Sequence, residues 1–181
     1  MNEFFGIIER TKNKWLRFYR KKVFEWYTGQ KTQGLSILGN ITLINHNIKI
    51  GKNVFIYPGV MLWGDGEIAI GDNVNIGNNT VIYSSKSGGG VTIGDNTMIA
   101  AQCYIIDMDH GTASGKLIRE QENSIEKVTI GNDAWLGANV TILKGSNIGD
   151  GAVIGAKALV KGEIPSGTIA CGMPAKTVKK R

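Results

Sequence analysis

The sequence predicts an all-β fold, a parallel β-helix of stacked triangular coils that follows an N-terminal α-helix. Two observations predict the coils. An aliphatic residue recurs every six positions, and 25 glycines but only three prolines occur in the 181 residues. Six residues turn an α-helix through about 600°, so successive aliphatics would lie about 120° out of register. Six residues instead form a short strand and a corner, and three such units close one coil around its aliphatics.

The hexads have a recognisable composition. The most regular run has an aliphatic at every sixth position, at Ile130, Leu136, Ile142, Ile148, Ile154 and Val160. Gly usually follows the aliphatic and a polar residue comes next, and the fifth position is small or medium, as in Ala134 and Ala152. We expect Gly and Asn to supply left-handed backbone at the corners and the fifth residue to face a crowded interior. A β-sandwich would show alternating polarity and strands about 8–12 residues apart, and the sequence shows neither.

The repeat divides the chain into three parts. Residues 1–35 form a basic, aromatic helical segment, residues 36–172 form the β-helix, and residues 173–181 form a basic C-terminal tail. Two polar stretches break the period, one at residues 84–90 and a longer one at residues 111–127. Solenoids accept insertions as surface loops, and long loops are often functional, so we expect residues 111–127 to protrude and to serve the site.

Charge is concentrated at the two ends. Residues 1–35 hold eight Lys/Arg and three Asp/Glu, and residues 161–181 hold five and one. Basic ends suit cofactor phosphates or a membrane surface, while no nucleic-acid reader motif is present. Cys103 and Cys171 fit neither a metal motif nor a disulfide framework. The sequence shows no signal peptide and no stretch long enough to span a bilayer, so we expect a cytoplasmic protein, with the inner face of the membrane as an alternative site.

The N-terminal segment holds eight of the 14 aromatic residues. A stripe recurs at helical spacing, comprising Phe4, Ile8, Thr11, Trp15, Phe18 or Tyr19, and Val23. The favoured interpretation is a helix that packs this stripe against the coils and covers open strand edges. The alternative is attachment to an anionic membrane surface through the same aromatic and basic residues.

A candidate base lies where the coils open into the longer loop. His110 ends the segment Asp107-Met108-Asp109-His110 and is one of two histidines in the chain. A hydroxyl is a poor nucleophile until a base removes its proton, and imidazole suits that task near neutral pH. Asp107 or Asp109 would orient the ring, and the sequence does not distinguish between them. His46, in an irregular early coil, is expected to be structural or exposed.

Residues 36–178 resemble the hexapeptide-repeat acyltransferases. The run from Ile130 to Val160 and the segment Gly172-Met173-Pro174-Ala175-Lys176 carry the resemblance. Within the family the chain is most similar to bacterial O-acetyltransferases of sugars and surface polysaccharides. The resemblance implies left-handed coils, a homotrimer with active sites between subunits, acetyl-CoA as acetyl donor and a saccharide acceptor. His110 would be the general base for direct attack on the thioester.

The resemblance also assigns residues to the two substrates. For the acceptor it points to Asn79, and the hydroxyls of Ser84 and Ser85 are further candidates for hydrogen bonds to a sugar. The backbone amide of Ala138 is a candidate for stabilising the oxyanion. The positions that match the family's donor site are Trp135 beside the thioester, Gly155 and Ala156 along the pantetheine arm, and Lys161 and Lys176 near the phosphates.

Three alternatives to O-acetylation place different demands on the sequence. N-acetylation of an amino-sugar nucleotide or of an antibiotic would depend less on His110, because an amine loses its proton more easily. A non-enzymatic binding scaffold explains the coils but gives no reason for a histidine at the loop. A γ-type carbonic anhydrase needs three histidines on one zinc and the chain has two, so this function is excluded and no metal is expected.

Overall fold

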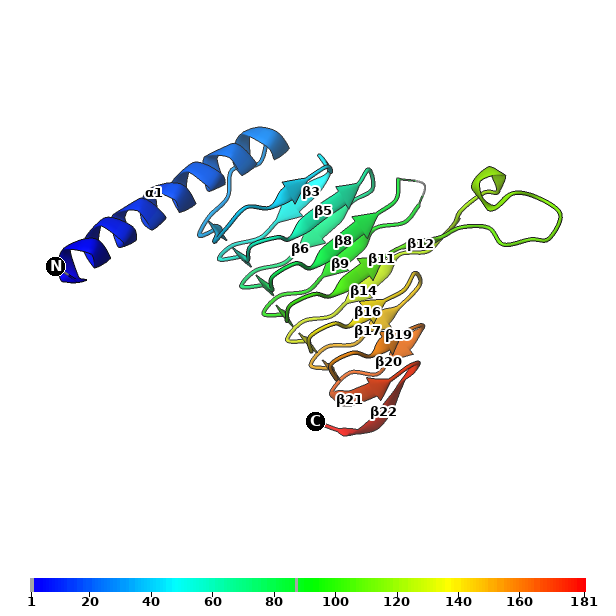
Figure 1. Ribbon diagram of the computed structural model, residues 1–181. Coiled ribbons are helices and arrows are strands. Elements are labelled where there is room, and N and C mark those ends of the chain that lie inside the picture. Colours follow the sequence, from blue (N-terminus) through cyan, green and yellow to red (C-terminus); the bar gives the residue numbers. More distant parts are fainter. Residues whose placement is uncertain (1, 87) are drawn as a thin grey trace.

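The computed structural model describes residues 2–86 and 88–181, with side chains from residue 11 onward. Helix α1 (Asn2–Thr28) leads into a solenoid of about seven coils whose strands stack in parallel (Figure 1). The predicted β-helix with an N-terminal helix is therefore confirmed. The side chains of Phe4, Ile8 and Arg10 lie outside the described ones.

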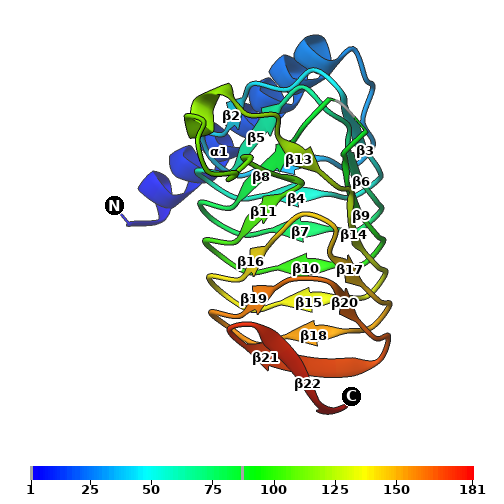
Figure 2. The same cartoon turned by 90° about the vertical axis from the view of Figure 1, so that its right-hand side faces the viewer.

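Three sheets form the faces of the solenoid, and Figure 2 shows their strands in three columns; all of these strands pair in parallel except β22. Sheet A contains β1 (Ser36–Ile37), β4 (Phe55–Ile56), β7 (Asn75–Ile76), β10 (Met98–Ile99), β15 (Trp135–Leu136), β18 (Val153–Ile154), β21 (Thr168–Gly172) and β22 (Ala175–Lys180). Sheet B contains β2 (Thr42–Leu43), β5 (Met61–Gly64), β8 (Val81–Ser84), β11 (Tyr104–Ile106), β16 (Thr141–Ile142) and β19 (Leu159–Val160). Sheet C contains β3 (Ile48–Ile50), β6 (Ile68–Ile70), β9 (Val91–Ile93), β14 (Val128–Ile130), β17 (Asn147–Ile148) and β20 (Glu163–Ile164).

The aliphatic hexad positions form one continuous core. Ile130, Leu136 and Ile142 are at most 1% exposed, and the fifth-position residues Ala134 and Ala152 are equally buried. Burying such an aliphatic side chain contributes roughly 1.5–3 kcal/mol. Because each coil repeats the pattern, the contributions accumulate along the stack and fix the register of every strand.

The corners explain the rest of the hexad. The chain passes the first corner between sheets A and B, the second between B and C, and the third between C and A. At the third corner, Asp72 Oδ1 accepts the Lys52 amide, and Asp95 Oδ1 accepts the Asp72 amide, both at 2.7 Å. Asn73 lies there at φ 58°, as predicted for a corner asparagine. A β-carbon on Gly51 would collide with the backbone of the next coil, so the second position needs glycine.

The two interruptions of the repeat both leave the solenoid at the second corner. Residues 111–127 form an excursion, and its base is closed by β12 (Met108–Asp109), which precedes it, pairing antiparallel with β13 (Ser124–Ile125). A 3₁₀ turn, η1 (Ile118–Glu120), lies near its tip. Figure 1 shows this loop projecting well away from the coils.

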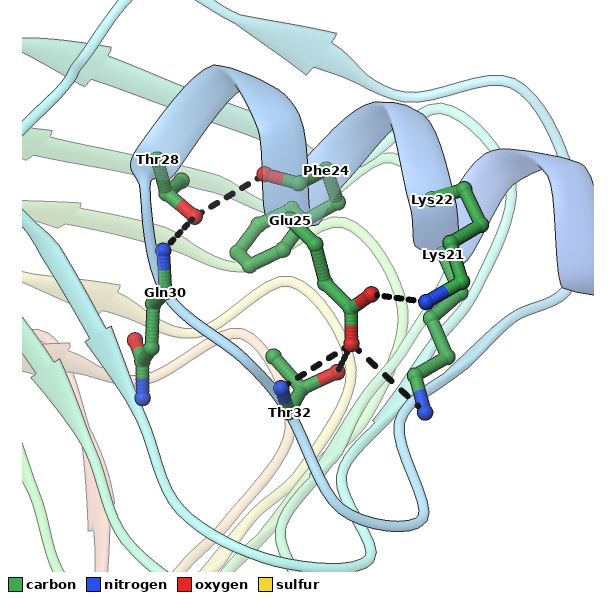
Figure 3. Close-up of polar contacts among 7 residues, drawn as sticks. All are labelled: Lys21, Lys22, Phe24, Glu25, Thr28, Gln30 and Thr32. Carbon is green, nitrogen blue, oxygen red and sulfur yellow. Dashed lines mark hydrogen bonds and ion pairs between the residues drawn. The ribbon is translucent and has the colours of Figure 1, made fainter.

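Helix α1 is fastened to the first coil near its C-terminal end. Phe24 is fully buried, and the Glu25 carboxylate accepts hydrogen bonds from the Thr32 amide and hydroxyl, each at 3.0 Å (Figure 3). Lys22 Nζ donates to the other carboxylate oxygen at 2.8 Å. These contacts, the Lys22 bond foremost, lower the pKa of Glu25 from 4.5 to about 2.

The expected packing of the aromatic stripe is wrong for the described residues. Trp15, Phe18, Tyr19 and Val23 are 41–63% exposed, and the coils are contacted through Phe24 instead. Phe24 is the side chain that the fold encloses, whereas Tyr19 and Val23 line an open pocket between the helix and the first coil. Tyr27 adds a second contact, since its ring stacks on His46 with centroids 4.1 Å apart. His46 is thus structural, as predicted.

The C-terminal tail folds back across the last coil. Strand β22 runs antiparallel to β21, with Lys176 opposite Cys171, and covers the open end of sheet A. Arg181 Nη1 forms an ion pair with Asp133 at 2.8 Å. Within residues 2–86 and 88–181, no helix combines the length and the apolar character that crossing a bilayer requires.

Candidate active site

His110 lies at the end of a groove on the outer face of sheet B. We call this feature the imidazole groove; its volume is about 490 Å³ and its lining is Trp63, Tyr83, Tyr104, Ile106, Met108, Asp109, His110 and Asn123. Strands β5, β8 and β11 supply the first four residues, because alternate positions of a strand face outward. Partial burial and the neighbouring Tyr83 raise the pKa of Tyr104, so its hydroxyl stays a hydrogen-bond donor.

The partner of the imidazole is Asn123. His110 Nδ1 lies 2.9 Å from Asn123 Oδ1, which can only accept, so Nδ1 carries the hydrogen and Nε2 is left with a free lone pair. The predicted orientation of the ring by an aspartate is therefore wrong. Neither Asp107 nor Asp109 has a hydrogen bond to His110 among the described residues.

Asp107 instead closes the second corner from inside. Its side chain is fully buried, and it accepts the amides of Ser85 and Gly90 at 2.7–2.9 Å and the Ser84 hydroxyl at 3.2 Å. A buried carboxylate is tolerated only when it is bonded in this way. The two serines predicted to bind the acceptor, Ser84 and Ser85, are both buried, so that prediction is also wrong. The Ser84 hydroxyl is used within the fold, and Ser85 Oγ is enclosed with no described partner.

Asp109 lies at the base of the projecting loop. Lys144 Nζ lies 3.9 Å from Asp109 Oδ2 and donates to Glu126 Oε1 and Ser124 Oγ at 2.8 and 2.9 Å. The ion pair lowers the pKa of Glu126 and raises that of Lys144. Lys144 therefore joins both arms of the loop to the next coil, which positions Asn123 beside His110.

The first corner offers unpaired backbone amides. At the third corner an Asp or Asn of the next coil accepts the third-position amides of Lys52, Asp72, Asp95 and Asn132. At the first corner of three later coils that position is Ala101, Ala138 or Ala156. An alanine side chain accepts nothing, and the amides of these three alanines have no acceptor among the described residues. We call them the open-amide corner. Unpaired donors at an edge are suited to a ligand's carbonyl or oxyanion.

The predicted donor-site residues are divided between two corners. Trp135 projects from β15 and is 49% exposed, and Gly155, Ala138 and Ala156 lie at the first corner just beyond sheet A. Lys176 lies at the same edge, because β22 places it beside Cys171 and β21 follows β18. Lys161 does not join them, since it lies at the second corner in a pocket with Asp109 and Lys144.

Asn79 also lies at the first corner, exposed and at φ 57°. Its backbone conformation is the one that the corner requires, whatever else the side chain does. It does not line the imidazole groove. Cys103 points into the core, and burial raises the pKa of its thiol, which leaves it a poor nucleophile.

Two parts of a site therefore lie on different edges of sheet B. Each strand of that sheet begins after the first corner and ends at the second, so the open-amide corner and His110 occupy opposite edges of the same face. Sequence reasoning missed the groove aromatics and Asn123. The aromatics do carry a signal, because Trp63, Tyr83 and Tyr104 each occupy an outward strand position. For Asn123 no signal exists in the spacing, since its place depends on how the loop returns.

Comparisons with known proteins agree with this architecture. Family profiles match residues 127–162, described as bacterial transferase hexapeptide (six repeats), and residues 67–106, described as hexapeptide repeat of succinyl-transferase. The putative lipopolysaccharide biosynthesis O-acetyl transferase WbbJ of Escherichia coli is 39% identical over 74% of this chain and 72% of its own length. The galactoside O-acetyltransferase of the same organism is 33% identical over 72% of this chain and 63% of its own length.

A solved structure gives the same fold. AntD, an N-acyltransferase from Bacillus cereus in complex with dTDP and 3-hydroxybutyryl-CoA, superposes with a TM-score of 0.79 at 21% identity, covering 90% of this chain and 88% of AntD. The fold together with these relatives defines the class, an acyltransferase that uses an acyl-CoA donor. The chain belongs to the bacterial hexapeptide-repeat transferase family.

Proposed function

We propose that this protein is an O-acetyltransferase that moves the acetyl group of acetyl-CoA to a hydroxyl of a sugar or surface polysaccharide. The observation that carries the proposal is the His110–Asn123 contact, which leaves Nε2 of an exposed imidazole free at the end of a groove. The named functions of WbbJ and of the galactoside enzyme support a hydroxyl acceptor.

His110 acts as the general base. Its Nε2 takes the proton of the acceptor hydroxyl as the oxygen attacks the thioester carbonyl, and the sulfur–carbon bond then breaks. The imidazolium returns the proton to the departing thiolate, so the ring is neutral again after each turnover. Asn123 keeps the ring in the tautomer that this proton transfer needs.

The open-amide corner fits the acyl donor. The amide of Ala138 donates to the oxyanion that forms in the transition state, and removal of one such donor typically costs about 100- to 1000-fold in rate. Gly155 and Ala156 present little side chain, so a pantetheine arm can approach the backbone closely. Trp135 covers the thioester from sheet A, and Lys176, at the same edge, supplies charge for the phosphates.

The test is release of CoA from acetyl-CoA with a panel of hydroxyl and amine acceptors. We expect turnover on sugar hydroxyls and a loss of about 100- to 10,000-fold in kcat for His110→Ala. Turnover restricted to amines would replace the proposal with N-acetylation. Undiminished activity of His110→Ala would remove the imidazole from the mechanism.

The active unit is a homotrimer in which neighbouring subunits complete each site. The imidazole of His110 and the open-amide corner lie on opposite edges of sheet B, so within one chain the base and the amides are separated by the width of that sheet. A second copy of the chain brings its first corner to the His110 edge without any bending of the solenoid. Sedimentation at the mass of a single 19.6 kDa chain under assay conditions would contradict this assembly.

Helix α1 attaches the enzyme to the inner face of the membrane. Trp15, Tyr19 and Trp26 are 53–83% exposed on one side of the helix, with Lys12 exposed near them and Lys14 and Arg17 exposed on other sides. Aromatic rings and lysines of this arrangement suit an anionic lipid interface. We expect co-sedimentation with vesicles containing phosphatidylglycerol and none with phosphatidylcholine alone, and equal binding to both would contradict an electrostatic attachment.

A further inference from the structure

The imidazole groove extends well beyond the imidazole. Trp63 and Tyr83 are register partners on β5 and β8, and Ile106 on β11 is the partner of Tyr83. The rings of Trp63 and Tyr83 meet edge to face, with centroids 5.3 Å apart. Neighbouring strands lie about 4.8 Å apart, so the row from Trp63 to Ile106 spans about 10 Å before His110 is reached.

The direction of this row is informative. The amides of Ala138 and Ala156 lie on coils that follow the His110 coil, whereas Trp63 and Tyr83 lie on coils that precede it. In an assembly whose coils run parallel, an acyl donor on the open amides therefore approaches His110 from the C-terminal side. The imidazole groove on the N-terminal side is left for the acceptor.

The chemistry of the groove suits a carbohydrate. Trp63 and Tyr104 are 44% and 38% exposed, so both rings present apolar surface to the groove. Such rings pack on the apolar faces of pyranose rings, while the hydroxyls of Tyr83 and Tyr104 hydrogen-bond to the sugar edge. Two strand spacings match about two linked pyranose rings.

We propose that the imidazole groove binds at least two sugar rings of the acceptor, with Trp63 forming a distal subsite and Tyr83 and Tyr104 the subsite next to His110. The proposal rests on the proposed O-acetyl transfer and deepens it, because it makes an oligosaccharide chain the preferred acceptor. Trp63 is too far along the row to touch the reacting hydroxyl, so it acts on specificity and not on the chemical step.

The test compares one-ring and two-ring acceptors. Methyl glycosides of galactose, glucose and N-acetylglucosamine are assayed against lactose, cellobiose and chitobiose, with wild type, Trp63→Ala and Trp63→Phe. We expect kcat/KM to favour the two-ring member of at least one pair by about tenfold, the value of one aromatic contact. Trp63→Ala should bring that ratio to about one, because it lowers kcat/KM for the two-ring acceptor far more than for the one-ring acceptor, and Trp63→Phe should retain most of the preference.

Phe55→Ala is the matched control, since Phe55 is 39% exposed on β4 of sheet A and should leave the ratio unchanged. Single-ring turnover without any two-ring preference overturns the distal subsite and leaves the transferase assignment intact. Absence of turnover on every hydroxyl overturns both. A change in oligomer mass for Trp63→Ala, with both acceptors affected equally, shows instead that a neighbouring subunit covers the groove and also overturns the subsite.

Discussion

Asp107 and His110 lie three residues apart and serve different parts of the molecule. The backbone alternates its side chains across β11 and β12, so Asp107 turns into the second corner while His110 turns outward into the imidazole groove. Both residue types are common in active sites, and proximity along the chain made them look like one catalytic pair. Only burial separates them, because a fully enclosed carboxylate must be bonded to the backbone around it.

Asp107→Ala should reduce stability more than chemistry. It removes the acceptor of two buried amides and one hydroxyl, and we expect the free energy of unfolding to fall by about 3 kcal/mol. Ser85→Ala is the matched control, because it deletes a buried hydroxyl without a described partner and should be neutral or slightly stabilising. Denaturant unfolding measures both changes. An Asp107→Ala protein that keeps its stability but loses its activity would support a catalytic role for Asp107 and contradict the structural one.

Asn123→Ala should lower kcat about tenfold with little change in KM, because one hydrogen bond that orients the base is lost. Asn123→Asp keeps an acceptor at the same place and should retain most of the rate. Equal kcat values for wild type and Asn123→Ala at every pH would show that Asn123 does not position the ring.

Helix α1 shows how an element can be predicted correctly and oriented wrongly. Aromatic spacing identified a helix in residues 1–35, but a helix rich in aromatics on several sides offers more than one face to the coils. The face that docks is decided by contacts with residues beyond the helix, those of Glu25 with Thr32 and of Tyr27 with His46. Such contacts are invisible in a helical repeat, because they depend on where the first coil begins.

Acid should loosen this attachment. The folded-state pKa of Glu25 is about 2, below its ordinary value of 4.5, so the ionised carboxylate stabilises the docked helix above pH about 4.5 and this contribution is lost as the pH falls toward 2. Hydrogen-exchange protection of the Thr32 amide, which donates to Glu25, should therefore fall between about pH 5 and about pH 2.5. Glu25→Gln should show weak protection at both pH values. Equal protection of the wild type across this interval would contradict the account.

At the scale of the whole molecule, the six-residue period predicts the coils because each hexad repeats the same local packing and the same corner conformation. The aliphatic fills the core, glycine admits the next coil, and Asn73 and its equivalents turn the corner. Side chains that meet across coils are about 20 residues apart in sequence, as Trp63 and Tyr83 are, and no local pattern pairs them. The donor-site residues came from the resemblance to the family, and only the fold shows that Lys161 lies apart from Lys176.

The proposed trimer predicts that two inactive variants restore activity when their chains assemble together. His110→Ala removes the base, and Ala156→Glu fills the exposed open-amide corner without disturbing the core, so each homotrimer should be inactive. If a site takes His110 from one subunit and the corner from the next, random 1:1 mixing restores both wild-type parts in about a quarter of the sites. Unfolding and refolding the two variants together, followed by the CoA-release assay, should recover about that fraction of wild-type activity. Separately refolded and then combined samples are the control. No recovery in the co-refolded sample would mean that both parts of the site belong to one chain, which would require a movement of the projecting loop across the face of sheet B.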